Sequence, residues 1–158
     1  MRGFFFESFN AREFQKATGL AVEFVQDNHS LSQRGVLRGL HFQRQHPQGK
    51  LIRVTQGRVF DVAVDIRPDS PHFGRWTGHY LDAQRHQQIW IPPGFAHGFL
   101  VVSENAEVNY KSTDYWVAED EGAILWNDPD LGIDWPLNEG GVAPQLSTKD
   151  AAAPRFAQ

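Results

Sequence analysis

The stretch RVFDVAVDI, residues 58–66, decides how this chain folds. Its side chains alternate with a period of two, as they do along a β-strand. The two sets would lie on opposite faces, with Phe60, Val62, Val64 and Ile66 on one face and Asp61, Ala63 and Asp65 on the other. This alternation predicts a strand and points to a fold built from sheets.

Further short segments on both sides of this stretch have the composition of strands. The predicted strands cover residues 21–26, 36–43, 50–55, 76–81, 88–91, 97–103, 107–113 and 123–126. Gln56-Gly57 separates two strands and predicts a hairpin there. The strings RPDSP and PPG mark further turns. Many short strands at a spacing of roughly 8–12 residues favour an all-β sandwich or barrel, and at this length we predict a jelly roll.

One short helix is predicted near the start of the chain. Asn10 is a suitable N-cap, Glu13 is placed as its capping-box partner, and Gly19 supplies a C-terminal stop. Phe14 and Ala17 give this helix a small apolar face. From about residue 136 onward the pattern fades into Asn-, Gly-, Pro- and Ala-rich sequence, so we predict a mostly irregular tail. The 158 residues fit one domain, covering 1–158.

Composition excludes several classes of function. The net charge of −4 with no basic run disfavours nucleic-acid binding. No apolar stretch reaches the roughly 18 residues of a membrane helix, and Glu7 ends the initial apolar run too early for a signal peptide. We therefore expect a cytoplasmic protein without nucleic-acid or membrane partners. Zero cysteines exclude disulfides, thiolate catalysis and Cys-ligated metals.

Two histidines occupy positions suited to chemistry. Arg38 and His41 would face opposite sides of an ideal strand, but Gly39 between them indicates a bulge that could turn both toward one cavity. His97 follows a Pro/Gly turn at the start of an apolar strand, where ligand sites are frequent. Each histidine could equally be a packed structural residue.

The spacing of these histidines argues against a catalytic metal. Metal-binding jelly rolls typically use a His-x-His pair, and here Gln43 stands where the second ligand belongs. His41 remains available as a general acid or base, because its reference pKa is near working pH. It needs an orienting carboxylate, and the spacing does not rank Asp61, Asp65 and Asp150 for that role. Tyr110, on a later strand, could donate a proton or be structural.

Ten strings, in order along the chain, closely resemble a known enzyme family. They are FFFESFN, FVQDNHS, GVLRGLHFQ, QGKLIRV, DVAVDIR, SPHFG, QIWIPPGFAHGF, YKSTDYW, WNDPDLGIDWP and LSTKD. The family is dTDP-4-dehydrorhamnose 3,5-epimerase, and the resemblance covers residues 2 to about 150. It implies a double-stranded β-helix of the cupin jelly-roll type, a homodimer, no metal or organic cofactor, and conversion of dTDP-4-keto-6-deoxy-D-glucose to dTDP-4-keto-L-rhamnose through an enolate.

The resemblance also implies residue roles. His41 would be the base that removes the C3 and C5 protons, Asp150 its partner, and Tyr110 the acid on the opposite ring face. Lys50 and His97 would line the sugar site, with Lys50 stabilising the enolate. Positions that match the family's substrate-binding residues are Arg2, Glu7, Gln26, Asp27, Asn28, Arg38, Glu121 and Lys149. Among these, Arg38 would bind the diphosphate region, and Arg2 and Glu7 would act across the dimer.

The chain departs from the family pattern at two points. Trp116 stands where the family more usually has the tyrosine that can stack on thymine, and Trp keeps that stacking surface. Members usually carry a further strand before the RGFFFES string, so we expect upstream residues, where they exist, to raise the melting temperature. Alternatives to double epimerisation are epimerisation at C3 or C5 alone, a metal-dependent cupin oxygenase, and a non-catalytic sugar-nucleotide-binding module.

Overall fold

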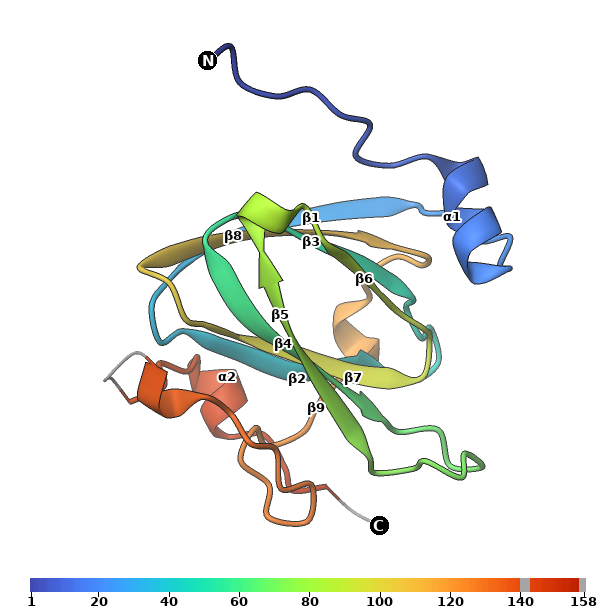
Figure 1. The fold of residues 1–158 in the computed structure, drawn as a ribbon. Coiled ribbons are helices and arrows are strands. Elements are labelled where there is room, and N and C mark those ends of the chain that lie inside the picture. Colours follow the sequence, from blue (N-terminus) through green and yellow to red (C-terminus); the bar gives the residue numbers. More distant parts are fainter. Residues whose placement is uncertain (140–142, 157–158) are drawn as a thin grey trace.

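The fold is two antiparallel sheets that face each other (Figure 1). The computed structural model describes residues 1–139 and 143–156. The four-stranded sheet has the order β1-β8-β3-β6, with bounds Gln26–Gln33, Asn105–Ser112, Lys50–Gln56 and Gln88–Ile91. The five-stranded sheet has the order β5-β4-β7-β2-β9, with bounds Trp76–Asp82, Arg58–Asp65, Phe95–Val101, Leu37–Gln43 and Glu121–Ala123. The predicted all-β jelly roll is confirmed.

Strand β4 is buried on both faces and separates two apolar cores. Between the sheets lies an inner core that includes Val59 and Ala63 of β4 together with Ile52 of β3. On the other face of the five-stranded sheet lies an outer core that includes Phe60 and Val62. The period of two in residues 58–66 is therefore confirmed, and each set of side chains contributes to a different core.

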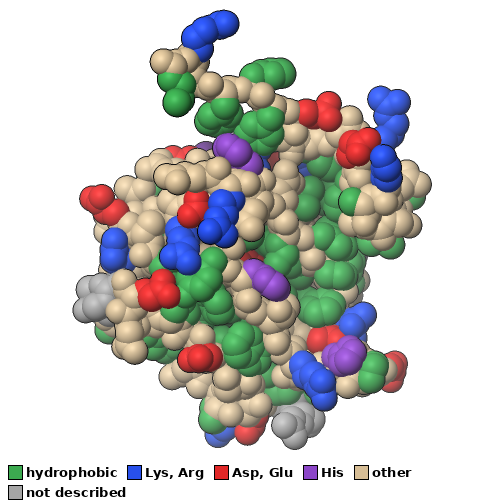
Figure 2. All heavy atoms as spheres, in the orientation of Figure 1, with side chains coloured by type: hydrophobic (Ala, Val, Ile, Leu, Met, Phe, Trp, Pro, Cys, Tyr) green, Lys and Arg blue, Asp and Glu red, His purple; other side chains and the backbone are tan. Residues whose placement is uncertain are grey.

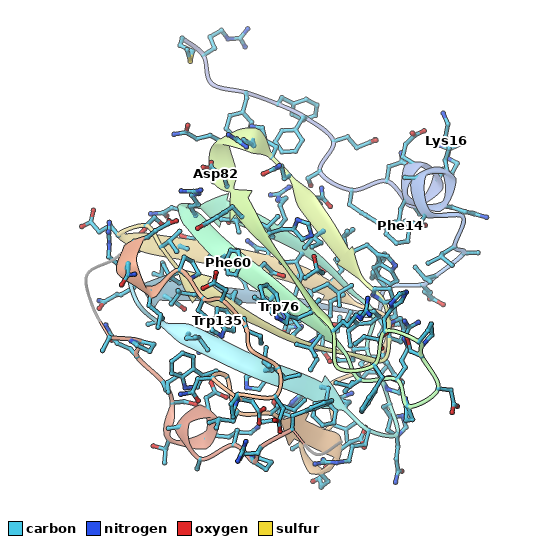
Figure 3. The ribbon with its side chains drawn as sticks, turned by 60° about the horizontal axis from the view of Figure 1, so that its bottom comes forward. Phe14, Lys16, Phe60, Trp76, Asp82 and Trp135 are labelled. Atoms are coloured by element: carbon cyan, nitrogen blue, oxygen red, sulfur yellow. The ribbon has the colours of Figure 1, made fainter. Side chains whose placement is uncertain are left out.

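The C-terminal part of the chain covers the outer core. The ring of Trp135 contacts the ring of Phe60, with centroids 6.2 Å apart, and Figure 3 shows the two residues close together. Trp135 Nε1 donates to the carbonyl oxygen of Trp126 (2.8 Å). Short helical pieces interrupt the connections and this segment, namely η1 Ala83–Arg85, η2 Ala118–Asp120, η3 Leu137–Glu139 and α2 Thr148–Ala151. In the parts of the tail that the structure describes, 136–139 and 143–156, the chain is mostly irregular as predicted, but α2 was missed. The rest of the predicted irregular tail lies outside the described residues.

Helix α1 runs from Ala11 to Thr18, as predicted. The side chain of Asn10 accepts hydrogen bonds from the backbone of Arg12 and Glu13, and Gly19 ends the helix with a left-handed φ of 73°. Phe14 packs edge-on against Phe24 and Trp90. Ala17 lies exposed, so Phe14 alone forms the apolar face of the helix. No helix among the described residues is long and apolar enough to cross a membrane.

The predicted hairpin at Gln56-Gly57 is wrong. Strand β3 pairs with β6 and β8, whereas β4 pairs with β5 and β7, so the chain crosses from one sheet to the other at this turn. Gly57 has a φ of 75°, and a Cβ there would lie 2.0 Å from the carbonyl oxygen of Asn105. Gly57 thus allows the tight turn by which the chain passes from β3 in one sheet to β4 in the other, and it does not belong to a hairpin.

The predicted strand at residues 21–26 is also wrong, because β1 begins only at Gln26. The apolar alternation there reflects Phe24, which packs against Phe9 and Phe14. Strand β1 itself, QDNHSLSQ, has a polar inner face and was missed for that reason. Strand β9 ends at Ala123, where the predicted strand at residues 123–126 begins. The other predicted strands agree with the structure to within two residues at either end.

Candidate active site

A bulge in β2 aims Arg38 and His41 into the space between the sheets. The register with β7 shifts between these two residues, and Gly39 has a φ of 121°. Leu37 and Leu40 consequently both pack in the outer core, although they are three residues apart. A Cβ at Gly39 would lie 2.6 Å from the Cα of Gly98 in β7, so only glycine fits this bulge. The bulge predicted from Gly39 is confirmed.

His41 is paired with Asp150. His41 Nε2 lies 2.6 Å from Asp150 Oδ1, and Asp150 is buried on α2. The Ser147 hydroxyl caps α2 by accepting the Asp150 backbone N–H at 3.0 Å. Burial alone would raise the pKa of Asp150, but the hydrogen bond and charge of His41, together with hydrogen bonds to Ser147 and Gly39, outweigh burial and hold that pKa below its usual value. Of the three carboxylates that the sequence left open for His41, the structure selects this one.

A cavity opens beside His41. Side chains from both sheets and from the loop after β8 line it, namely His41, Phe42, Gln43, Gln48, Lys50, Tyr110, Trp116 and Glu121. His41 belongs to β2 of the five-stranded sheet, and Tyr110 belongs to β8 of the four-stranded sheet. The imidazole and the phenol therefore approach the cavity from opposite sides.

Lys50 and Tyr110 have shifted pKa values. Lys50 Nζ lies 5.6 Å from the centroid of the Tyr110 ring. Burial lowers the pKa of Lys50 to about 8, while the negative charges of Asp61 and Glu121 act in the opposite direction. Burial, aided by the charge of Glu121, raises the pKa of Tyr110. Near neutral pH the cavity therefore contains an ammonium group and a protonated phenol.

A second histidine is paired with a carboxylate on the neighbouring strands. His97 of β7 lies directly opposite His41 in the β2–β7 register. His97 Nε2 lies 2.8 Å from Asp61 Oδ2, and both side chains are buried. The other oxygen, Asp61 Oδ1, has no hydrogen-bond partner among the residues that the structure describes. Among residues 1–139 and 143–156, no three His, Asp or Glu side chains are grouped to hold a metal ion.

Strand β1 supplies polar side chains to the inner side of the four-stranded sheet. Gln26 Nε2 donates to Asn28 Oδ1 at 3.0 Å, and Asn28 lies directly opposite Tyr110 in the register. Arg38 Nε donates to the buried hydroxyl of Ser32 at 3.0 Å, across the space between the sheets. The structure thus brings Gln26, Asn28 and Arg38 to the inner side.

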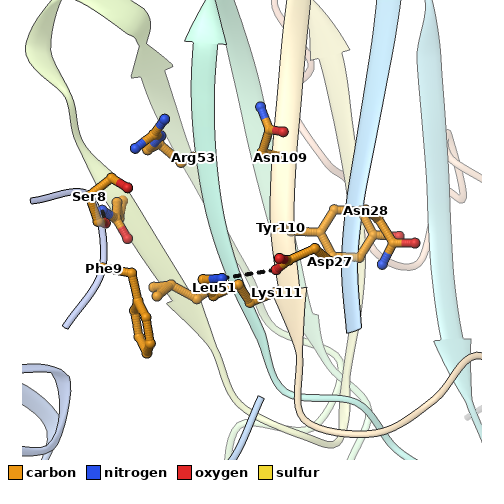
Figure 4. A pocket seen from close by; sticks show the side chains of 10 residues that line it. Ser8, Phe9, Asp27, Asn28, Leu51, Arg53, Asn109, Tyr110 and Lys111 are labelled. Carbon is orange, nitrogen blue, oxygen red and sulfur yellow. Dashed lines mark hydrogen bonds and ion pairs between the residues drawn. The ribbon is translucent and has the colours of Figure 1, made fainter. Parts of the chain in front are cut away.

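Asp27 points the other way. It forms an ion pair of 3.0 Å with Lys111 on the outer face of the four-stranded sheet. Figure 4 shows the two residues beside a second cavity, which also contacts Ser8 and Phe9 of the N-terminal segment. Alternation along β1 separates Asp27 from its two neighbours in the QDN string.

Glu121 connects the remaining predicted binding residues. It forms an ion pair with Lys149 of α2, and its carboxylate accepts a hydrogen bond of 3.4 Å from Trp116 Nε1. Arg2 and Glu7 belong to the exposed segment before α1, which runs above the four-stranded sheet in Figure 1. Within one chain, the structure does not bring these two residues to the cavity.

From the sequence, Gln43 stood out only as a residue unsuited to bind a metal. Gln43 is buried two residues after His41 and lines the same cavity. Ser32 was missed because β1 was missed. A usable signal was present in both cases, because a polar side chain at an inward-facing strand position must find polar partners.

Comparison with known proteins places this architecture in a family. A family model described as dTDP-4-dehydrorhamnose 3,5-epimerase matches residues 1–158. The enzyme of that name from Pseudomonas aeruginosa is 60% identical over 156 residues, which cover 99% of this chain and 84% of the relative. A crystal structure of the Legionella pneumophila enzyme with dTDP-4-keto-L-rhamnose superposes with a TM-score of 0.93 at 56% identity, covering 98% of this chain and 80% of that one.

A more distant relative has a narrower activity. A 3′-monoepimerase from Streptomyces bikiniensis, in complex with dTDP-quinovose, superposes with a TM-score of 0.86 at 34% identity, covering 94% of this chain and 74% of that one. Identity to these two 3,5-epimerases is thus considerably higher than identity to this monoepimerase. With the family model matched from end to end and relatives this similar, the chain belongs to the dTDP-4-dehydrorhamnose 3,5-epimerase family.

Proposed function

We propose that this protein epimerises C3 and C5 of dTDP-4-keto-6-deoxy-D-glucose and so produces dTDP-4-keto-L-rhamnose. The observation that carries the proposal is the placement of His41 and Tyr110, which face one cavity from opposite sheets. Inversion at carbon requires that a proton leaves one ring face and another arrives on the opposite face. Two separate groups on opposite sides of the sugar meet that requirement.

His41 removes the proton in this mechanism. The C3 and C5 protons lie next to the C4 ketone, and their removal leaves the electron pair delocalised onto the ketone oxygen as an enolate. The carboxylate of Asp150, 2.6 Å from His41 Nε2, fixes the ring and stabilises the imidazolium that forms. The other ring nitrogen is then free to approach the sugar, which agrees with the position of His41 at the cavity wall.

Lys50 stabilises the enolate oxygen. At pH 7 the medium is one unit below the Lys50 pKa of about 8, so about nine-tenths of the amines are protonated. An ammonium group in a mostly buried site interacts with developing negative charge far more strongly than it would in water. His97, held by Asp61 at 2.8 Å, contributes a fixed polar group beside the same region.

Tyr110 returns a proton to carbon from the opposite face. Its raised pKa keeps the phenol protonated at neutral pH, so the proton is available when the enolate forms. Proton transfer to carbon leaves a phenolate, which the neighbouring Lys50 ammonium stabilises from 5.6 Å above the ring. The enzyme regains its starting state once Tyr110 is reprotonated and His41 is deprotonated.

The nucleotide occupies the polar inner face of β1 and the rim of the cavity. Arg38 provides a guanidinium for the diphosphate, and Gln26 and Asn28 provide amides for the nucleoside. The indole of Trp116 offers a flat surface for the thymine. Glu121 lines the cavity beside Trp116, and its ion pair with Lys149 places both charged groups where they can contact the substrate. Asp27, on the outer face of the sheet, contributes indirectly through its ion pair with Lys111.

The proposal includes a homodimer that works in the cytoplasm. Leu31 lies on the outer face of the four-stranded sheet with 62% of its surface exposed, and Phe4 and Phe5 are also exposed. Figure 2 shows hydrophobic side chains along the N-terminal extension. In such a dimer, Arg2 and Glu7 would act at the partner's site, as the family resemblance implies. Sedimentation equilibrium should therefore give twice the chain mass, and a monomer would refute the dimer.

The decisive experiment follows deuterium into the sugar. The protein, treated with EDTA, is incubated in D₂O with dTDP-4-keto-6-deoxy-D-glucose and monitored by proton NMR. Exchange at both C3 and C5, together with formation of the L-sugar, is the expected result. Exchange at one carbon would instead identify a single-position epimerase. Loss of all exchange after EDTA treatment, restored by a divalent metal, would contradict the proposed metal-free mechanism.

A further inference from the structure

Gln43 has an unusual set of hydrogen bonds for a buried glutamine. Only 7% of its surface is exposed, and its side-chain amide is bonded on both sides. Nε2 donates to the carbonyl oxygens of His46 (2.7 Å) and Tyr115 (3.1 Å). Oε1 accepts the backbone N–H of Val117 at 2.7 Å. One side chain at the end of β2 therefore bonds to the backbone of two separate loops.

These bonds enclose Trp116 in the loop after β8. Tyr115 and Val117 are its immediate neighbours, and the backbone N–H of Trp116 itself donates to Gln26 Oε1 at 3.0 Å. Three consecutive residues are thus fixed by side-chain amides from β1 and β2. A loop held in this way retains little backbone freedom, although it lies at the surface.

The side chain of Trp116 is, in contrast, largely exposed. The residue is 55% exposed, its ring lines the cavity beside His41, and its Nε1 is 3.4 Å from Glu121. An exposed aromatic ring on a rigid backbone is preorganised to bind a flat partner, because little conformational entropy remains to be lost. The nucleobase of a sugar nucleotide is such a partner, as the proposed function requires.

We propose that Gln43 is a positioning residue for nucleotide binding, which holds the Trp116 ring in place for the base. Gln43 lies two residues after His41 on the same strand, so β2 fixes the base-binding surface and the catalytic imidazole in one frame. The inference rests on the proposed function, since it assumes that a thymidine nucleotide occupies the cavity. Gln43 itself acts through the loop and takes no part in proton transfer.

The test is Gln43→Met, which keeps the length of the side chain and removes its hydrogen bonds. We expect the Kd for dTDP, measured by calorimetry, and the KM for the sugar nucleotide to rise by about 5- to 30-fold. We expect kcat to fall by less than about threefold, because binding contacts far from the reacting carbons act equally on ground and transition states. An unchanged Kd and KM in a folded variant would overturn the inference.

A matched control is Gln56→Leu. Gln56 also uses its amide for a side-chain hydrogen bond, to Asn105 at 2.7 Å, but lies at the far end of β3. The Kd of the Gln56→Leu variant for dTDP and its KM for the sugar nucleotide should equal those of the unaltered protein. If Gln43→Met does not fold, Gln43→Glu retains the acceptor for Val117 and loses the two donated bonds. This variant should still weaken dTDP binding, and an unchanged Kd would overturn the inference equally well.

A double-mutant cycle separates positioning from general damage. Trp116→Ala removes the stacking surface and should raise the Kd for dTDP by about 5- to 150-fold. If Gln43 acts through Trp116, then Gln43→Met in that background should change the Kd by less than about twofold. Fully additive losses would overturn the inference while the proposed function stands. Absence of dTDP binding and turnover in the unaltered protein would instead refute the proposed function.

Discussion

The two imidazole–carboxylate pairs of this protein have nearly the same geometry and very different surroundings. His41 and Asp150 are 2.6 Å apart, and His97 and Asp61 are 2.8 Å apart. The His41 side chain is 30% exposed and lines the cavity, whereas the His97 side chain is 7% exposed. Both histidines therefore contact a carboxylate, and they differ in how far the imidazole is accessible to a substrate.

The partners also differ in origin. Asp61 lies on β4, next to β7, and is built into the sheet. Asp150 comes from α2, a short helix in the C-terminal segment that crosses over to β2. The pair within the sheet is fixed by the folding of the core. The pair at the cavity is completed by a mostly irregular segment near the C-terminus. Because His41 lines the cavity, this pair can exchange a proton with a ligand.

The largest expected effect comes from His41→Asn. We expect kcat/KM to fall by about 10²–10⁴-fold and deuterium exchange at C3 and C5 to stop, because no other group would abstract the proton. His97→Asn should retain measurable exchange, since His97 only supports the enolate. Turnover and NMR exchange of both variants check this difference. Equal rates of exchange in the two variants would show that the comparison assigns the base incorrectly.

A large effect on stability is expected for Asp61→Ala. Removal of one member of a buried pair leaves the other without compensation, at a cost of about 3–5 kcal/mol. Asp150→Ala should cost less than half as much, because water can reach the His41 ring. Chemical denaturation of both variants gives the two free energies of unfolding. If Asp150→Ala proved the more destabilising change, burial would not be what separates the pairs.

Tyr110→Phe tests the side of the cavity opposite His41. Epimerisation should fall by about 10²-fold, because the phenol that returns the proton is absent. Exchange of substrate protons with D₂O should fall much less, since abstraction by His41 survives. The ratio of exchange to product formation, followed by NMR, is the quantity to measure. A variant that loses both equally would assign Tyr110 to a step before deprotonation.

The smallest expected effects are shifts in pH dependence. Activity should decline as the pH rises through about 8, where Lys50 loses the proton that stabilises the enolate. The charges of Asp61 and Glu121 raise the Lys50 pKa, so Asp61→Asn should move this decline to lower pH. Glu121→Gln should move it in the same direction by less, because its charge acts more weakly on Lys50. A kcat profile from pH 6 to 10 measures both shifts, and a move to higher pH would contradict the assignment.

Local sequence predicted the elements that depend on near neighbours. The caps of α1 at Asn10 and Gly19, the alternation in residues 58–66 and the bulge at Gly39 are all confirmed. Each depends on interactions within a few residues, or on the backbone freedom of one glycine. Strand β1 was not predicted, because its inner face is polar and it therefore lacks the apolar alternation that indicates a strand.

Pairing across the fold was decided only by the tertiary structure. Residues near Gln56-Gly57 favour a turn, but they do not say which strands the turn joins, and here it joins two sheets. The sequence offered three carboxylates for His41, and the structure joined it to Asp150, 109 residues away. It separated Asp27 from its neighbours and gave Gln43 its place beside Trp116. The reason is that local propensity acts over one turn or one strand. Which distant strands and side chains come into contact is decided only when both faces of a sheet are packed against other elements.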